Sequence, residues 1–169
     1  HQCDRRQRQM CIRDRPRAPF TTSSLQQDSS SRLRLSPSRT MALAQQLFQG
    51  INLGNGEEGL ITYMRTDSTA LSNQSLVEIK NYVNKSYGDN YYESRKYKTK
   101  SANAQEAHEA IRPTSINRTP DSIKSFLDDD QFKLYDLIWK RTVASQMSES
   151  VNKKTTIITS SENEKFKFK

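Results

Sequence analysis

The segment that most narrowly limits how this chain can fold runs from Asp130 to Met147. Its apolar side chains recur every three or four residues, which is the period of an α-helix. They are Phe132, Tyr135, Ile138, Trp139, Val143 and Met147. Such a stripe is far more often part of a hydrophobic core than of a cofactor site. We therefore expect a long core helix here, with Asp130 as its N-terminal cap.

Start and stop signals predict further helices. Ser24 and Gln27 have capping-box spacing, and Ser36 precedes a proline that suits a first helical turn. The helices expected from these and similar signals cover residues 24–36, 37–49, 72–86 and 104–111. Extended runs are expected at 60–64, 155–159 and 166–168, the last from its strict alternation of apolar and charged residues. The pattern predicts a mainly α fold with short β segments towards its ends.

The overall charge favours an anionic partner. The 169 residues carry a formal net charge of +8 with a pI near 9.6, and nucleic acid is the commonest partner of a basic chain. No apolar run approaches bilayer length and no secretory pattern opens the chain, so we expect a cytoplasmic protein without membrane association. Cys3 and Cys11 fit no zinc pattern, and His1 and His108 are the only histidines, so a metal cluster of cysteines or histidines is excluded.

Residues 1–15 differ in character from the rest of the chain. They hold five arginines and two aspartates, which supply +3 of the net charge, and they contain both cysteines. One interpretation is a basic arm that binds nucleic acid. The other is that RRQRQMCIRDR resembles a translated sequencing adapter. We favour the second and expect a non-native or disordered segment there.

The segment from Gly59 to Ser68, GLITYMRTDS, contains the first candidate chemistry. In an extended segment, Ile61, Tyr63 and Arg65 share one face. A tyrosine hydroxyl is a poor nucleophile by itself, and a nearby cation favours the phenolate and stabilises charge on a phosphate. The alternative is a buried strand tyrosine beside a solvated arginine, which the residues alone leave open.

The segment QEAHEAIRPT, residues 105–114, contains the second candidate group. On a helix, Gln105, His108 and Arg112 would form a polar stripe. His108 could orient a phenol or a phosphate by hydrogen bonding. The alternative is a histidine whose hydrogen bonds are satisfied within the fold.

Five phrases in this order resemble bacterial type IA DNA topoisomerases. They are PFTTSSLQQ (19–27), RTMALAQQLF (39–48), GLITYMRTDS (59–68), QEAHEAIRPT (105–114) and LYDLIWKRTVASQM (134–147). The resemblance covers the chain from about Arg17 onward, and the ordered set of phrases is very specific.

The resemblance implies a role for each site residue. Tyr63 matches the nucleophile that forms a 5′-phosphotyrosine with single-stranded DNA, and Arg65 matches the arginine that contacts the cleaved strand and supports catalysis. Asp67, His108 and Arg112 are expected at the DNA-binding site. The implied reaction is transesterification, which relaxes negative supercoils without ATP.

The resemblance also implies an organisation and a cofactor. We expect residues 16–23 to end a β-rich arch domain, 24–150 to form a helical domain with a winged-helix-like core, and 151–169 to return into the arch. The Mg²⁺ of the family is held by an acidic N-terminal domain that nothing in this chain matches. No metal site is therefore expected here, and the chain alone is expected to be inactive.

Two other functions remain open. The chain could be a non-catalytic winged-helix-like DNA-binding module, or a helical interaction domain with no role on nucleic acid. The preferred expectation is a monomeric enzyme part that acts on DNA near the nucleoid together with the missing domains of the same polypeptide.

Overall fold

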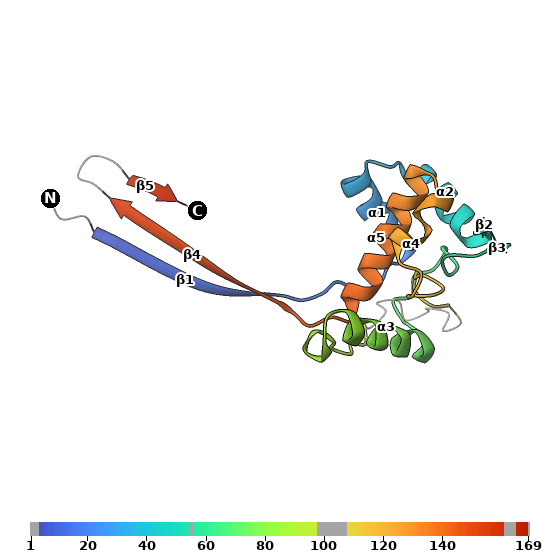
Figure 1. The fold of residues 1–169 in the computed structure, drawn as a ribbon. Helices are drawn as coiled ribbons and strands as arrows, with labels where there is room; N and C mark the ends of the chain where they lie inside the picture. Colours follow the sequence, from blue (N-terminus) through green and yellow to red (C-terminus); the bar gives the residue numbers. More distant parts are fainter. Residues whose placement is uncertain (1–3, 55, 98–107, 161–164, 169) are drawn as a thin grey trace. The chain divides into compact units, whose positions relative to one another are not determined.

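The computed structural model describes residues 4–54, 56–97, 108–160 and 165–168, and it divides the chain into two compact units. The strand unit comprises His1–Pro16 and Glu149–Lys169, and the helical unit comprises Arg17–Ser148. Figure 1 shows the strands and helices of each unit.

The strand unit is an antiparallel sheet in the order β1-β4-β5. Strand β1 (Asp4–Asp14) pairs with β4 (Ser150–Ser160) along its whole length, from Asp4 opposite Ser160 to Asp14 opposite Ser150. Strand β5 (Lys165–Phe168) pairs with the far end of β4. Residues Asp4–Asp14, which lie in the segment expected to be non-native or disordered, form strand β1. Strand β4 is also longer than the predicted 155–159.

The helical unit consists of helices and two very short strands. The elements are α1 (Thr22–Asp28), a π-helical turn η1 (Ser29–Leu33), α2 (Pro37–Gln49), β2 (Ile51–Asn52), β3 (Glu57–Glu58), α3 (Asn73–Ser86), 3-10 turns η2 (Asp89–Tyr91) and η3 (Lys124–Phe126), α4 (Pro120–Ile123) and α5 (Asp129–Ser145). The helices at 37–49, 72–86 and 130–147 are confirmed to within two residues at each end. None of the helices in the described residues is long and apolar enough to cross a membrane.

Side-chain caps explain where the helices begin. Ser36 and Ser72 each accept a hydrogen bond from the backbone of the third helical residue. Two of the predicted caps are wrong. The capping box of α1 joins Thr21 to Ser24 rather than Ser24 to Gln27, and Asp128 with Gln131 caps α5 in place of Asp130.

The core of the helical unit forms around α5. In Figure 1, α1, α2 and α4 gather around it. The predicted stripe is buried as expected at Tyr135, Ile138, Trp139 and Val143. The two large aromatic side chains keep their polar atoms satisfied, because Trp139 Nε1 donates to the Ile116 carbonyl at 3.0 Å and the Tyr135 hydroxyl donates to the Arg118 carbonyl at 2.8 Å. The aromatic stripe is thus core, as the sequence indicated.

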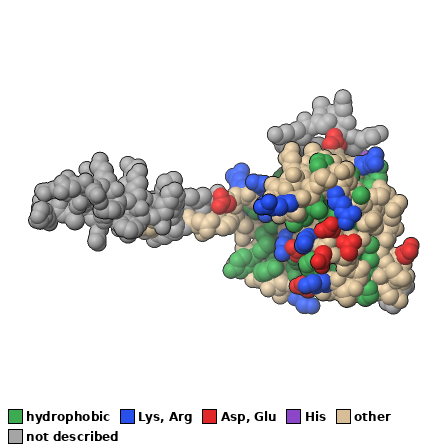
Figure 2. Space-filling model, turned by 90° about the horizontal axis from the view of Figure 1, so that it is seen from above, with side chains coloured by type: hydrophobic (Ala, Val, Ile, Leu, Met, Phe, Trp, Pro, Cys, Tyr) green, Lys and Arg blue, Asp and Glu red, His purple; other side chains and the backbone are tan. Residues whose placement is uncertain are grey.

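The surface of the helical unit carries charges of both signs. Figure 2 shows Lys and Arg side chains interspersed with Asp and Glu on one face of the unit. Net charge alone therefore does not select a binding surface on that face.

Candidate functional site

The segment from Leu60 to Asp67 is held on one side by residues 110–114. The Thr62 N–H donates to the Arg112 carbonyl at 2.9 Å, and the Thr114 N–H donates to the Leu60 carbonyl at 3.0 Å. The Thr62 hydroxyl also donates to the Ala110 carbonyl at 2.7 Å. These bonds fix the backbone on both sides of Ile61.

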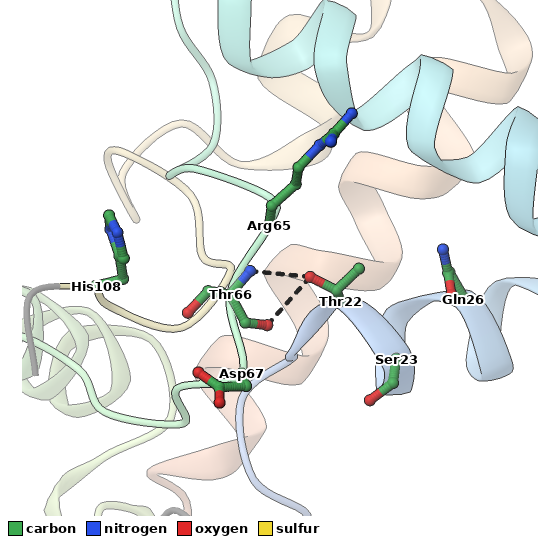
Figure 3. A pocket seen from close by; sticks show the side chains of 7 residues that line it. All are labelled: Thr22, Ser23, Gln26, Arg65, Thr66, Asp67 and His108. Atoms are coloured by element: carbon green, nitrogen blue, oxygen red, sulfur yellow. Dashed lines mark hydrogen bonds between the residues drawn. The ribbon is translucent and has the colours of Figure 1, made fainter. Parts of the chain in front are cut away.

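A single threonine at the start of α1 holds the other side. The Thr22 hydroxyl donates to the Met64 carbonyl at 2.7 Å and accepts from the Thr66 N–H at 2.9 Å. The Thr22 N–H also donates to the Thr66 carbonyl at 2.9 Å. Figure 3 shows Thr22 and Thr66 facing each other across this contact. The backbone from Met64 to Thr66 is therefore pinned to the helix start.

The pinned segment alternates between buried and exposed side chains. Met64, Thr66 and Ser68 are buried, whereas Tyr63, Arg65 and Asp67 are exposed. The prediction that Tyr63 and Arg65 share one face is confirmed. The prediction that Ile61 joins them is wrong, because Ile61 is only 1% exposed and belongs to the core. The alternation of buried and exposed side chains starts after Thr62. Up to Thr62 the segment bonds to residues 110–114, and from Met64 onward it bonds to Thr22.

Tyr63 stands between two rings and keeps access to solvent. Its ring lies edge-on to Phe48, with the ring centres 5.5 Å apart, and tilted against His108 at 5.8 Å. The side chain is still 40% exposed. Two aromatic contacts limit the orientations of the phenol, while its exposure leaves it open to a ligand. The alternative of a buried strand tyrosine is therefore wrong.

An open cavity of about 530 Å³ lies beside this segment. Its lining residues are Thr22, Ser23, Gln26, Arg65, Thr66, Asp67 and His108. Figure 3 shows that they come from three stretches of chain, namely the start of α1, the segment after Tyr63, and the segment at His108. Neither Arg65 nor Asp67 makes an ion pair with another described residue. The Arg65 guanidinium thus keeps its donors for a ligand in the cavity.

Arg112, predicted beside these residues, has a different environment. Its side chain is 14% exposed and donates to the Glu109 carboxylate at 2.5 Å and to the Pro113 carbonyl at 2.9 Å. It does not line the cavity. The guanidinium is bonded within the fold, and its expected contact with DNA stays a prediction.

The helix predicted at 104–111 falls mostly outside the described residues. The part that is described is not helical, and Ile111 bridges to Phe20 through its N–H and the Phe20 carbonyl at 2.8 Å. His108 therefore reaches the cavity from a non-helical segment and not from a helix face.

Sequence reasoning missed the residues that position the site. The sequence patterns place Phe48 in the helix expected at 37–49 and Thr22 within residues 16–23, and they single out neither residue. Thr22 is more than forty residues from its partners in the chain, so no local pattern could identify the contact. The Thr-Thr pair at the start of a helix indicates a cap, which is the one local signal present.

The described residues offer no ready place for a metal ion. No group of three or more His, Cys, Asp or Glu side chains gathers among them. Asp67 is the only acidic side chain that lines the cavity. A single carboxylate is too few for a Mg²⁺ site built by this part of the chain.

The assembled groups suit chemistry on a phosphate. They combine a partly exposed phenol, a guanidinium on the same face of the segment, and an imidazole ring against the phenol. A guanidinium can donate two parallel hydrogen bonds to a phosphate. The arrangement can therefore bind a phosphodiester next to a hydroxyl nucleophile.

Comparisons with known proteins agree on one family. A sequence model of the DNA topoisomerase family matches residues 4–169. DNA topoisomerase 1 of Rickettsia conorii is 50% identical over 153 residues, which are 89% of this chain and 20% of the relative. The enzyme of Xylella fastidiosa is 48% identical over the same share of this chain and 19% of its own length. This chain thus spans about a fifth of the length of these relatives.

A solved structure extends the comparison to the fold. The structure of full-length topoisomerase I from Thermotoga maritima superposes with a TM-score of 0.79 at 38% identity, covering 96% of this chain and 26% of that protein. With a family match from residue 4 to residue 169, these similarities show that the chain belongs to the bacterial type IA DNA topoisomerase I family.

Proposed function

We propose that Tyr63 is the nucleophile of a type IA DNA topoisomerase and that this chain carries one side of the active site. The observation that supports this most directly is the position of Tyr63, 40% exposed between Phe48 and His108 and on the same face as Arg65. The Tyr63 hydroxyl attacks the phosphorus of a phosphodiester in single-stranded DNA. The phenol releases its proton to solvent as its oxygen bonds to the 5′-phosphate, and the bond from phosphorus to the 3′-oxygen breaks, so that this oxygen takes up a proton and becomes a 3′-hydroxyl. The reverse reaction reseals the strand.

Each cavity side chain has a distinct part in this proposal. Arg65 donates to the non-bridging phosphate oxygens and stabilises the charge that develops on them. His108, whose ring centre is 5.8 Å from that of Tyr63, orients the phenol. Asp67, the remaining charged residue of the lining, limits where the strand's phosphates can approach, since like charges repel. Arg112 stabilises the segment that follows His108 through its bonds to Glu109 and Pro113.

The complete reaction needs parts of the protein outside this chain. Mg²⁺ and a proton donor for the leaving oxygen would come from another domain, because the described residues here form no carboxylate cluster. Relaxation of negative supercoils by strand passage, without ATP, is proposed for the whole protein. We also propose that it works as a monomer on nucleoid DNA in the cytoplasm.

The division into domains is part of the same proposal. The helical unit corresponds to a winged-helix-like domain, whose core includes α5 and the buried side chains of segments 60–66 and 110–114. The strand unit corresponds to the edge of a β-rich arch, and the hinge proposed within residues 16–23 is confined to the residues before Thr22, where α1 begins. The sheet order β1-β4-β5 and the separation into two units support this division.

Covalent trapping of DNA tests the proposal. The chain is mixed with the separately produced metal-binding domain, Mg²⁺ and a labelled single-stranded oligonucleotide, and adducts are separated under denaturing conditions. We expect an adduct that Tyr63→Phe abolishes. The control is Tyr91→Phe, which removes a hydroxyl from a side chain that is 52% exposed. Survival of the adduct in Tyr63→Phe would contradict the proposal. DNA binding that is indifferent both to Tyr63→Phe and to the added domain would favour the non-catalytic DNA-binding module.

A further inference from the structure

Five cationic side chains line a second cavity, of about 500 Å³, between the α1–η1 region and α5. They are Arg17, Arg32, Lys133, Lys140 and Arg141, and the acidic residues of the lining are Asp28 and Asp136. Five cations and two carboxylates leave a formal surplus of three positive charges. An open cavity with such a surplus attracts anions.

Three of the five cationic side chains surround a single carboxylate, that of Asp28. Asp28 accepts from Arg141 and lies 3.4 Å from Arg32 and 3.8 Å from Arg17. Three guanidiniums carry more N–H donors than the two oxygens of one carboxylate can accept. The donors left over suit the oxygens of a phosphate, which a guanidinium binds in a fork.

The three arginines differ in solvent exposure. Arg141 is 13% exposed, and its guanidinium stacks over the Phe20 ring at 4.4 Å. Burial lowers its pKa, and the opposing charge of Asp28 counteracts this. Arg17 and Arg32 are 71% and 59% exposed, so they can turn from Asp28 towards an incoming anion at little cost.

This cavity lies on a different side of α1 from the cavity that Arg65 lines. Gln26 lines the cavity next to Tyr63, and Asp28 lines the basic one. Residues two positions apart on an α-helix are rotated by about 200° around the helix axis. The side chains of Gln26 and Asp28 therefore leave α1 on opposite sides. Phosphates bound by the arginines around Asp28 therefore belong to a different stretch of nucleic acid from the phosphate bound by Arg65.

We propose that the basic cavity around Asp28 binds backbone phosphates of a DNA segment other than the one that Tyr63 attacks. The choice of DNA as the polyanion rests on the proposed function, whereas the affinity for phosphate oxygens follows from the cluster itself. The exposed side chains of Arg17, Arg32 and Lys133 supply the adjustable contacts, and Arg141 with Asp28 forms the fixed floor.

The salt dependence of DNA binding tests the proposal. Binding of a labelled single-stranded oligonucleotide of mixed sequence to the full chain is measured by fluorescence anisotropy, without metal or added domains, over a range of salt concentrations. Arg32→Gln combined with Lys133→Gln is compared with Lys80→Gln combined with Lys85→Gln, which removes the same charge from the exposed face of α3. We expect the first pair to weaken binding several-fold more than the second. It should also reduce the slope of log K against log salt by about 1.4, or about 0.7 for each lost contact to a single strand.

Two outcomes of this experiment would contradict the proposed DNA site. Equal weakening and equal slopes in the two double variants would mean general electrostatic attraction, and would overturn the proposal. Stabilisation of the unaltered chain by inorganic phosphate over chloride at equal ionic strength, with no change of slope in the first variant, would mean a site for free phosphate and not for DNA. Urea unfolding of both variants checks that they fold. Because Tyr63 chemistry is absent from this assay, failure of covalent trapping would leave the slope difference standing.

Discussion

Thr22 and Thr66 hold each other by a reciprocal pair of hydrogen bonds. The Thr22 hydroxyl accepts from the Thr66 N–H, and the Thr22 N–H donates to the Thr66 carbonyl, both at 2.9 Å. The pair joins the first turn of α1 to the segment that presents Tyr63 and Arg65. The alternation of buried and exposed side chains in that segment depends on this contact, since no regular strand partner is paired with residues 63–67.

Removing the Thr22 hydroxyl should loosen the site and destabilise the helical unit. Thr22→Val leaves the Thr66 N–H and the Met64 carbonyl without this partner, and an unsatisfied buried group costs about 1–3 kcal/mol. Thr22→Ser keeps the hydroxyl and should stay close to the unaltered chain. Urea unfolding followed by circular dichroism measures both. Equal stability of the two variants would show that the hydroxyl has no such role.

Substitution of Arg112 should lower the free energy of unfolding, whereas substitution of Arg65 should leave it almost unchanged. Arg112→Ala removes a 14% exposed guanidinium that is bonded to Glu109 and Pro113, so a loss of about 1.5–3 kcal/mol in unfolding free energy is expected. Arg65→Ala removes an exposed side chain without a described ion-pair partner, so stability should change by about 0.5 kcal/mol or less.

The effect of Arg65 should appear in the chemistry instead. In the covalent trapping assay, Arg65→Ala should slow adduct formation by about 10²–10³-fold, as expected for the loss of one group that stabilises a transition-state charge. Arg65→Lys serves as the comparison, because it keeps the charge without the bidentate fork and should recover only part of the rate. An Arg65→Ala variant that forms adduct at the normal rate but unfolds easily would contradict both expectations.

Much of the helical unit was predictable because its signals are local. Ser36, Ser72 and the apolar stripe of residues 130–147 define helices that need only their own sequence to be identified. The face shared by Tyr63 and Arg65 was predictable for the same reason, from the period of an extended chain.

The errors arose where distant contacts decide the structure. Residues 108–111 carry a helical pattern, yet Ile111 pairs with Phe20, more than ninety positions away, and this segment is not helical. Asp28 was not singled out as a charge centre, because Arg17, Arg32 and Arg141 meet only in the folded unit. Local propensity cannot report such pairs.

Alkaline pH should destabilise the helical unit through Tyr135. Burial raises the pKa of this hydroxyl above its ordinary value of 10, and the nearby Arg118 only partly opposes the shift. The unfolded chain releases the proton near pH 10, whereas the folded chain retains it to higher pH. The contribution of Tyr135 to stability is therefore complete below pH 10 and is lost as the pH rises above it.

Unfolding by urea between about pH 9 and pH 11 measures this effect. Tyr135→Phe should start less stable by about 1 kcal/mol, from the lost bond to the Arg118 carbonyl, but decline less with pH than the unaltered chain. Tyr97→Phe should give a smaller change of the same sign, because burial raises the pKa of Tyr97 as well. Tyr91→Phe, at an exposed position, is the control. If the free energy of unfolding declined equally with pH in all the variants, Tyr135 would not be the cause of the alkaline destabilisation.

The identity of residues 1–15 is open to a direct check. Strand β1 pairs with β4 from Asp4 to Asp14 through main-chain hydrogen bonds. Any residue except proline can make these bonds, so the pairing supports a strand at this place without supporting these particular side chains. The run RRQRQMCIRDR still resembles a translated adapter. We therefore expect a long sequencing read through the locus to show other codons in place of those for residues 1–15, followed without a break by Pro16. A read that reproduces His1–Arg15 would establish the basic strand as native, and Cys3 and Cys11 would then belong to the protein.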